Sequence, residues 1–171
     1  MSRALLVIDI QNDYFTGGAL PLFEAAETEE RILAAMAAAR GAGDRIILVQ
    51  HVSRASGGLF DPAGTGVAIR PAILSAAGEA PVVTKHDADA FQDTDLDSHL
   101  VGVKTLLVCG MMTQNCVVFT ALSRAADAFQ VRVVGDLCTA PSGVVHRITL
   151  NALGSKLTVS KASHEWPELV A

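Results

Sequence analysis

Short runs of apolar residues alternate with longer, alanine-rich segments along the chain. The first run, residues 4–10, lacks the polar alternation of a half-exposed strand and predicts a buried strand. Residues 29–40 place Ile32, Leu33 and Met36 on one face and predict a helix, with Thr28 as the N-cap. The same patterns predict strands over 45–51, 81–85, 104–110, 131–135 and 156–160, and helices over 95–103, 114–128 and 144–153.

Continuously apolar strands separated by helices are typical of a parallel sheet that is covered on both faces. The sequence therefore predicts an α/β fold: a three-layer, doubly wound sheet of about six mostly parallel strands. A length of 171 residues favours one domain, residues 1–171. Residues 53–66, rich in glycine, serine and proline, and the aspartate-rich residues 87–97 are the irregular regions, where function tends to lie.

The composition of the chain argues against nucleic acid and membranes as partners. The net charge is −5, and positive and negative residues are mixed along the chain, so we expect no nucleic-acid partner. No apolar stretch approaches membrane-spanning length, and the run at residues 4–8 is too short for a signal peptide. Three cysteines without metal or redox spacing indicate free thiols in a reducing compartment. We therefore expect a cytoplasmic protein without a membrane partner.

Cys116 is the first of three side chains that could carry chemistry. It lies near the predicted start of the helix that follows strand 104–110, where free amides and the helix dipole lower a thiol's pKa. Those amides can also receive an oxyanion. The alternative is ordinary packing against the sheet, which is the common role of a free cysteine and the role that we expect for Cys109 and Cys138.

Asp9 and Lys85 lie at or near the ends of two other predicted strands. A buried carboxylate needs a partner, and Lys85 could supply it as part of a structural ion pair or of a catalytic site. If both join Cys116 at the carboxyl edge of the sheet, the carboxylate can take the thiol's proton and the ammonium can stabilise the thiolate. The thiolate then attacks a carbonyl, and the carboxyl group protonates the leaving amine.

Three segments carry a resemblance to a known group of enzymes. Residues 5–15, 82–85 and 110–117 (LLVIDIQNDYF, VVTK and GMMTQNCV) are similar to motifs of the isochorismatase-like cysteine hydrolases, in the same order and spacing. This superfamily includes nicotinamidases and N-carbamoylsarcosine amidohydrolases. The resemblance extends from about residue 4 to about residue 140. It implies a Rossmann-like fold and the catalytic triad Asp9, Lys85 and Cys116.

The resemblance also implies surroundings for the triad. A cis peptide would join Met111 to Met112, and the backbone amides of Met112 and Cys116 would form the oxyanion hole. By motif position, the substrate-binding residues would be Gln11, Phe15, His51 and Phe91, for which ordinary core packing is the alternative. Members of the superfamily are often oligomeric, so a homo-oligomer, a dimer or larger, is expected.

Two departures from relatives refine the prediction. Nicotinamidases carry an Asp-x-His and a further His after the second strand, which bind a metal. Here that strand ends at His51 and no further histidine follows until His86, so we predict no metal and no cofactor. The enzymes that give the superfamily its name cleave a vinyl ether and lack the catalytic cysteine, whereas this chain has Cys116.

The predicted function is hydrolysis of a small-molecule amide or carbamoyl C–N bond through a thioester. One alternative is hydrolysis of a non-amide bond by a member of the same superfamily. Another is a non-catalytic module that binds a small molecule on the same fold. A dinucleotide enzyme is excluded, because residues 11–14 after the first strand lack the glycine fingerprint that such enzymes need.

Overall fold

A six-stranded, all-parallel sheet forms the centre of the computed structural model, which describes residues 2–170. The strand order is β3-β2-β1-β4-β5-β6, so the chain starts in the middle and winds outward in both directions. This is the doubly wound topology that the sequence predicts. The strands are β1 (Arg3–Ile8), β2 (Arg45–His51), β3 (Val82–Lys85), β4 (Thr105–Met111), β5 (Gln130–Thr139) and β6 (Thr158–Ser160).

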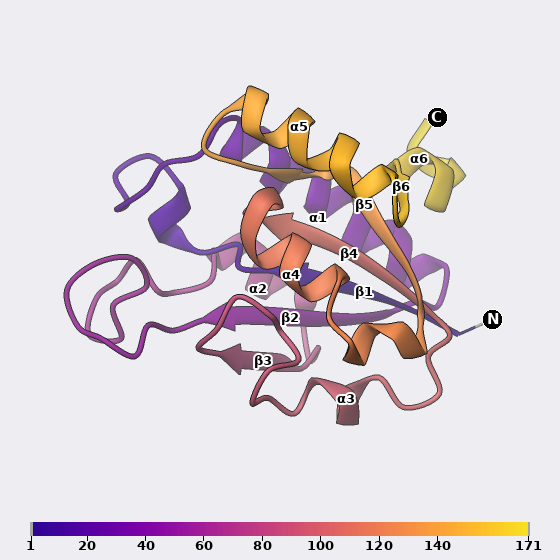
Figure 1. Cartoon of the computed structure of the whole chain (residues 1–171), viewed down its shortest axis with the longest axis horizontal. Coiled ribbons are helices and arrows are strands. Elements are labelled where there is room, and N and C mark those ends of the chain that lie inside the picture. The colour runs from indigo at the N-terminus through magenta and orange to yellow at the C-terminus, as the bar shows by residue number, and fades with distance from the viewer. Residues whose placement is uncertain (1, 171) are drawn as a thin grey trace.

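Helices cover both faces of the sheet. Figure 1 shows α1 and α2 behind the strands and α4 in front of them. The contacts agree, since α1 packs on α2 and β2, whereas α5 packs on the turn that precedes α4. The helices are α1 (Ala25–Gly41), α2 (Pro71–Ala77), α3 (Leu96–His99), α4 (Val118–Ala121), α5 (Gly143–Gly154) and α6 (Ala162–Glu165). In the described part of the chain, no helix combines the length and apolarity needed to cross a bilayer.

The two central strands explain why the sequence shows apolar runs without alternation. Every residue of β4 is buried, and in β1 only Arg3 is partly exposed. Helices on both faces remove both sides of these strands from water, so apolar side chains suit every position. The core therefore lies along β1 and β4, directly beneath the strand ends from which the candidate site is built.

Several predicted helices differ in the structure. Residues 114–128 are not one helix: a π-helical turn (Thr113–Val117) leads into the four-residue α4, and a 3-10 turn (Ala125–Ala128) follows. Residues 95–103 are helical only over α3. Helix α1 begins four residues before the predicted start, with Glu24 as N-cap, so Thr28 lies inside the helix. The short helices α2 and α6 were not predicted.

Gly110 fixes the close approach of β4 to β1 just before the turn that carries Cys116. Its φ is +123°, and a Cβ there would lie 2.1 Å from the carbonyl oxygen of Ile8. Because an L side chain is strained at this φ and the obstacle is backbone, we expect Gly110→Ala to lower the free energy of unfolding by about 3 kcal/mol or more. Urea denaturation measures this loss. Gly41→Ala is the matched control, since nothing lies within 4 Å of its Cβ position, and an equal effect of the two substitutions would contradict the prediction.

Candidate active site

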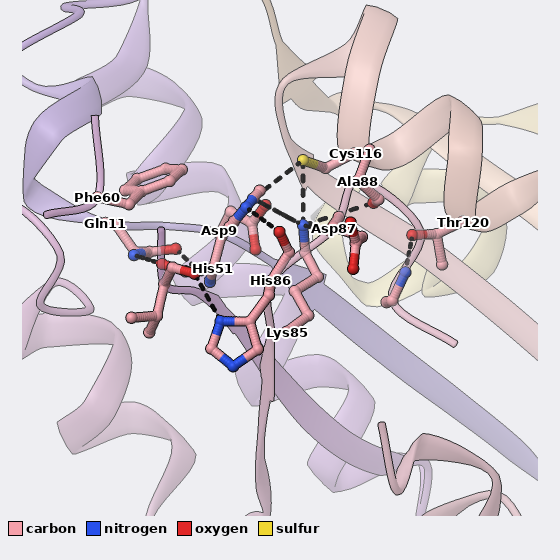
Figure 2. Close-up of polar contacts among 12 residues, drawn as sticks. Asp9, Gln11, His51, Phe60, Lys85, His86, Asp87, Ala88, Cys116 and Thr120 are labelled. Carbon is pink, nitrogen blue, oxygen red and sulfur yellow. Dashed lines mark hydrogen bonds and ion pairs between the residues drawn. The ribbon is translucent and has the colours of Figure 1, made fainter. Parts of the chain in front are cut away.

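The strand order brings three distant segments together at one edge of the sheet. Asp9 directly follows β1, Lys85 is the last residue of β3, and Cys116 lies in the turn after β4. Parallel strands end at the same edge, and only β2 separates β1 from β3. Figure 2 shows the side chains of Asp9, Lys85 and Cys116 pointing toward one another. The site thus lies at the carboxyl ends of the strands, beside the point where the winding reverses.

The ammonium of Lys85 is the centre of this cluster. Its Nζ lies 3.0 Å from Asp9 Oδ2 and 3.2 Å from Cys116 Sγ. It also donates to the backbone carbonyl of Asp87 at 2.9 Å. Asp9 and Lys85 are fully buried and Cys116 is 1% exposed. A buried carboxylate and a buried ammonium at this distance compensate each other's charge, which the apolar interior otherwise penalises.

Burial sets the proton positions in the resting site. It raises the pKa of the Asp9 carboxyl, and the positive charge of Lys85 offsets part of that increase. Burial and the neighbouring Asp9 charge raise the pKa of the Cys116 thiol. The lowered thiol pKa that we expect near the start of a helix is therefore not found: burial is the largest effect on this thiol, and the helix after the turn has only four residues.

Asp9 is suited to accept a proton. Its raised pKa makes the carboxylate a better base than an exposed aspartate. Within residues 2–170, both of its carboxylate oxygens are buried and accept no hydrogen bond. Oδ2 forms an ion pair with Lys85 at 3.0 Å, so Oδ1 remains available. Burial lowers the pKa of Lys85, but the interactions with Asp9 and Cys116 together raise it by more, so the pKa lies above its ordinary value. Lys85 therefore remains an ammonium across the neutral range.

Gln11 and His51 take positions that the sequence did not predict. His51 Nδ1 lies 3.1 Å from Lys85 Nζ and 3.8 Å from Cys116 Sγ, so His51 joins the charged cluster rather than forming only a pocket wall. Gln11 is fully buried, and its amide oxygen accepts the His51 N–H while its nitrogen donates to the His51 carbonyl, both at 2.8 Å. The same nitrogen also donates to Val67 O at 2.6 Å, so the Gln11 side chain holds the backbone of two neighbouring segments, and its role in substrate binding stays a prediction.

Two predicted wall residues, Phe15 and Phe91, have other ring partners. The guanidinium of Arg70 lies 4.2 Å from the centre of the Phe15 ring, and Phe91 stacks on Phe129 with centroids 6.3 Å apart. Phe15 is 6% exposed and Phe91 is partly buried. These contacts suit the core-packing alternative, and a role for either ring in substrate binding stays a prediction.

Phe60, which no motif in the sequence indicates, covers one side of the site. Its ring lies 5.2 Å from that of His51 and 5.0 Å from that of Tyr14. The Asp13 carboxylate accepts the Phe60 N–H at 2.6 Å, and Phe60 takes a left-handed φ of 59°. The only signal in the sequence was the irregular loop 53–66, which contains Phe60.

The three potential metal ligands at the site surround an ammonium. Asp9, His51 and Cys116 offer a carboxylate, an imidazole and a sulfur within 4.8 Å of one another. Lys85 Nζ lies between 3.0 and 3.2 Å from one such atom of each residue. A metal ion there would be repelled by the positive charge of Lys85 at close range, so these three groups are better suited to contact the Lys85 ammonium. The absence of a metal at this site stays a prediction.

The backbone before Cys116 also has unusual features. The peptide bond between Met111 and Met112 is cis, at the position that the motif implies. Met112 is 8% exposed, and in the described part of the chain its N–H donates to no backbone carbonyl or side chain, although its carbonyl accepts from Asn115 and Val117. A nearly buried N–H without a partner beside a thiol can receive a ligand oxygen.

The parallel sheet, with a buried cysteine, aspartate and lysine at its carboxyl edge, agrees with the fold that the resemblance implies. The family model described as the isochorismatase domain matches residues 3–162. The chain belongs to the isochorismatase family, a family of hydrolases.

Named relatives are consistent with that membership. The chain is 36% identical over 141 residues to an uncharacterized isochorismatase family protein, YddQ, of Bacillus subtilis strain 168, covering 81% of this chain and 78% of that protein. It is 27% identical to the nicotinamidase of Escherichia coli K12, covering 80% and 82%. The crystal structure of an isochorismatase family protein from Desulfovibrio vulgaris Hildenborough superimposes with a TM-score of 0.87 at 28% identity, covering 99% of both chains.

Proposed function

We propose that this protein hydrolyses the C–N bond of a small amide or carbamoyl compound through a thioester on Cys116. The observation that carries the proposal is the position of the Lys85 ammonium, 3.0 Å from the Asp9 carboxylate and 3.2 Å from the Cys116 sulfur in a buried site. A nucleophile, a base and a cation that stabilises the thiolate are the parts that acyl transfer to sulfur requires. The relative named as a nicotinamidase supports an amide substrate.

The mechanism begins with proton transfer from the Cys116 thiol to Asp9. The thiolate, stabilised by Lys85, attacks the substrate carbonyl, and the amides of Met112 and Cys116 receive the resulting oxyanion. The C–N bond then breaks, and the Asp9 carboxyl group gives its proton to the departing nitrogen. A water molecule attacks the thioester and gives a proton to Asp9, and that proton returns to the sulfur as the acid is released.

Hydrolysis of a non-amide bond remains the competing function within the family. It needs no covalent bond to sulfur, whereas amide hydrolysis by the proposed route requires one. The buried thiol beside an unpartnered carboxylate oxygen favours the covalent route, because Asp9 is placed to take the thiol's proton.

An ammonia-release screen over small amides, ureas and carbamoyl compounds tests the proposal. We expect at least one compound to release ammonia, and acid-quenched samples of that reaction to carry the acyl group on Cys116 by peptide mass spectrometry. Prior alkylation of Cys116 should abolish the release. Release that continues at full rate after complete alkylation would contradict the covalent mechanism.

The setting of the reaction follows from the sequence and the family resemblance. We place it in the cytoplasm, supported by three cysteines that are all free and buried. The homo-oligomer that the resemblance implies remains a proposal, which light scattering on the purified protein measures directly.

A further inference from the structure

His51 belongs to the hydrogen-bond network of Asp9, Lys85 and Cys116, whereas the resemblance implies a substrate-binding role for it. Strand register places it opposite Lys85 on neighbouring strands, at the end of the β2–β3 pairing. Its Nδ1 lies 3.1 Å from Lys85 Nζ, and its Nε2 lies 3.2 Å from the backbone carbonyl of His86. Both ring nitrogens therefore have fixed partners, one a donor and the other an acceptor.

These partners determine which ring nitrogen carries the proton. An ammonium can only donate, so Nδ1 must present a lone pair to Lys85. A backbone carbonyl can only accept, so Nε2 must carry the proton that faces His86. His51 is thus a neutral imidazole in a single tautomer. Burial and the Lys85 charge both lower the pKa of His51, in agreement with the neutral form.

A neutral acceptor beside Lys85 can hold the ammonium in place without cancelling its positive charge. The ammonium has three protons but four acceptors within 3.2 Å: the Asp87 carbonyl, His51 Nδ1, Asp9 Oδ2 and Cys116 Sγ. The carbonyl and the imidazole hold the ammonium without neutralising its charge. That charge remains available to the two groups between which the proposed mechanism moves a proton.

We propose that His51, held by Gln11, is a positioning residue that fixes the Lys85 ammonium between Asp9 and Cys116 by accepting its hydrogen bond as a neutral imidazole. Gln11 supplies the hold because its side-chain amide bonds to both the N–H and the carbonyl of His51. The Phe60 ring, 5.2 Å from the imidazole, covers the ring. The catalytic part of this inference rests on the proposed cysteine mechanism, but the tautomer and the Lys85 contact do not.

The first test therefore uses no substrate. Nitrogen-15 NMR of the full-length protein at pH 7.5 should show an unprotonated Nδ1 and a protonated Nε2 on His51. The Lys85 ammonium signal should shift in His51→Leu, which removes the acceptor, and not in the control His99→Leu, which removes a partly exposed histidine on α3. A protonated Nδ1, or an unchanged Lys85 signal in His51→Leu, would overturn the proposal.

The second test separates positioning from a wall of the substrate pocket. With a compound from the ammonia screen, His51→Leu should lower kcat about 10- to 100-fold, as expected for loss of a hydrogen bond to a charged group. His51→Asn should recover most of kcat, because its Oδ1 can replace Nδ1 as the acceptor. An increase in KM at unchanged kcat, or no recovery by Asn, would show that His51 does not act through Lys85.

The pH profile gives a third, independent measurement. The charged or titratable groups around the imidazole are Asp9, Lys85, Cys116 and Asp87. Protonating His51 removes the acceptor and adds a second positive charge beside Lys85. Because burial lowers the pKa of His51, wild-type kcat should fall in a step that lies below the ordinary histidine pKa of 6.5, and His51→Asn should lack that step. An identical profile in both proteins would overturn the positioning role.

If no compound in the screen is cleaved, the two proposals still separate. The NMR result stands without catalysis, and the alkylation rate of Cys116 by iodoacetamide, measured in wild type, His51→Leu and His51→Asn, then replaces kcat. A lower rate in the Leu variant with recovery in the Asn variant supports the role of His51 even where amide hydrolysis fails. Equal rates in all three proteins would count against it.

Discussion

Replacing Cys116 with alanine should lower kcat by about 10⁴-fold or more, because every covalent step of the proposed mechanism requires its sulfur. The substitution removes one atom from a side chain that is 1% exposed, so the fold should persist with only a small loss of stability. Steady-state ammonia release at equal protein concentration measures the effect, and far-ultraviolet circular dichroism verifies the fold.

Cys138→Ala is the matched control for that substitution. Cys138 is also a free, buried cysteine, but its Sγ donates to the Val134 carbonyl rather than to the triad. Its replacement should reduce stability by about 1 kcal/mol and leave kcat within a few-fold of wild type. If Cys116→Ala retained activity comparable to that of Cys138→Ala, the site would not act through a thioester, and direct attack of water on the substrate would become the better explanation.

The strands of the sheet can be predicted from the sequence because each one is marked by an apolar run within its own segment. Residues 45–51 coincide with β2, and the other strands are found with shifts of a few residues at their ends. Burial on both faces leaves an uninterrupted apolar run, which is readable without knowledge of the partner strands. The positions of Asp9, Lys85 and Cys116 at strand ends follow from the same signal, since all parallel strands end at one edge.

Helix boundaries are less predictable because they depend on tertiary contacts. Thr28 has the composition of an N-cap, yet it lies inside α1, where its side chain accepts a hydrogen bond from Arg31. Residues 114–128 are predicted as one helix, but α4 ends at Ala121. Helix α2 did carry a usable signal, since Pro71 occupies its first position, a common place for proline.

The role of His51 could not be predicted from its own neighbourhood in the sequence. It is adjacent to Lys85 only through the β2–β3 register, and its ring orientation is set by His86 and Lys85 together. The raised thiol pKa has a similar origin, because the depth of burial of Cys116 depends on how the whole molecule packs around it. Motif positions predict which residues lie close together, whereas their protonation states depend on the packing of the whole molecule.

Replacing Lys85 with methionine should affect both activity and stability. Loss of the ammonium leaves Asp9 as a buried charge without compensation, which costs about 3–5 kcal/mol of folding free energy at neutral pH. Turnover should fall by at least about 100-fold, because the thiolate loses the cation that stabilises it. Urea unfolding and steady-state kinetics measure the two losses separately.

The pH dependence identifies Asp9 as the cause of the instability. Burial raises the pKa of Asp9 in the folded protein above the ordinary carboxyl value of 3.8, and Lys85→Met removes the charge that counteracts this increase. A carboxyl group with a raised folded-state pKa stabilises the fold below its unfolded pKa and loses that contribution as the pH rises through the folded value. The stability difference between Lys85→Met and wild type should therefore shrink toward pH 4 and widen toward neutrality.

The double variant Asp9→Asn/Lys85→Met separates charge compensation from catalysis. Removing both charges leaves no buried ion, so stability at pH 7.5 should recover most of what the single Lys85 variant loses. Turnover should not recover, because neither the base nor the cation is present. If the double variant were as unstable at pH 7.5 as Lys85→Met alone, the loss would come from packing of the lysine stem, and the two buried charges would not depend on each other as the 3.0 Å contact indicates.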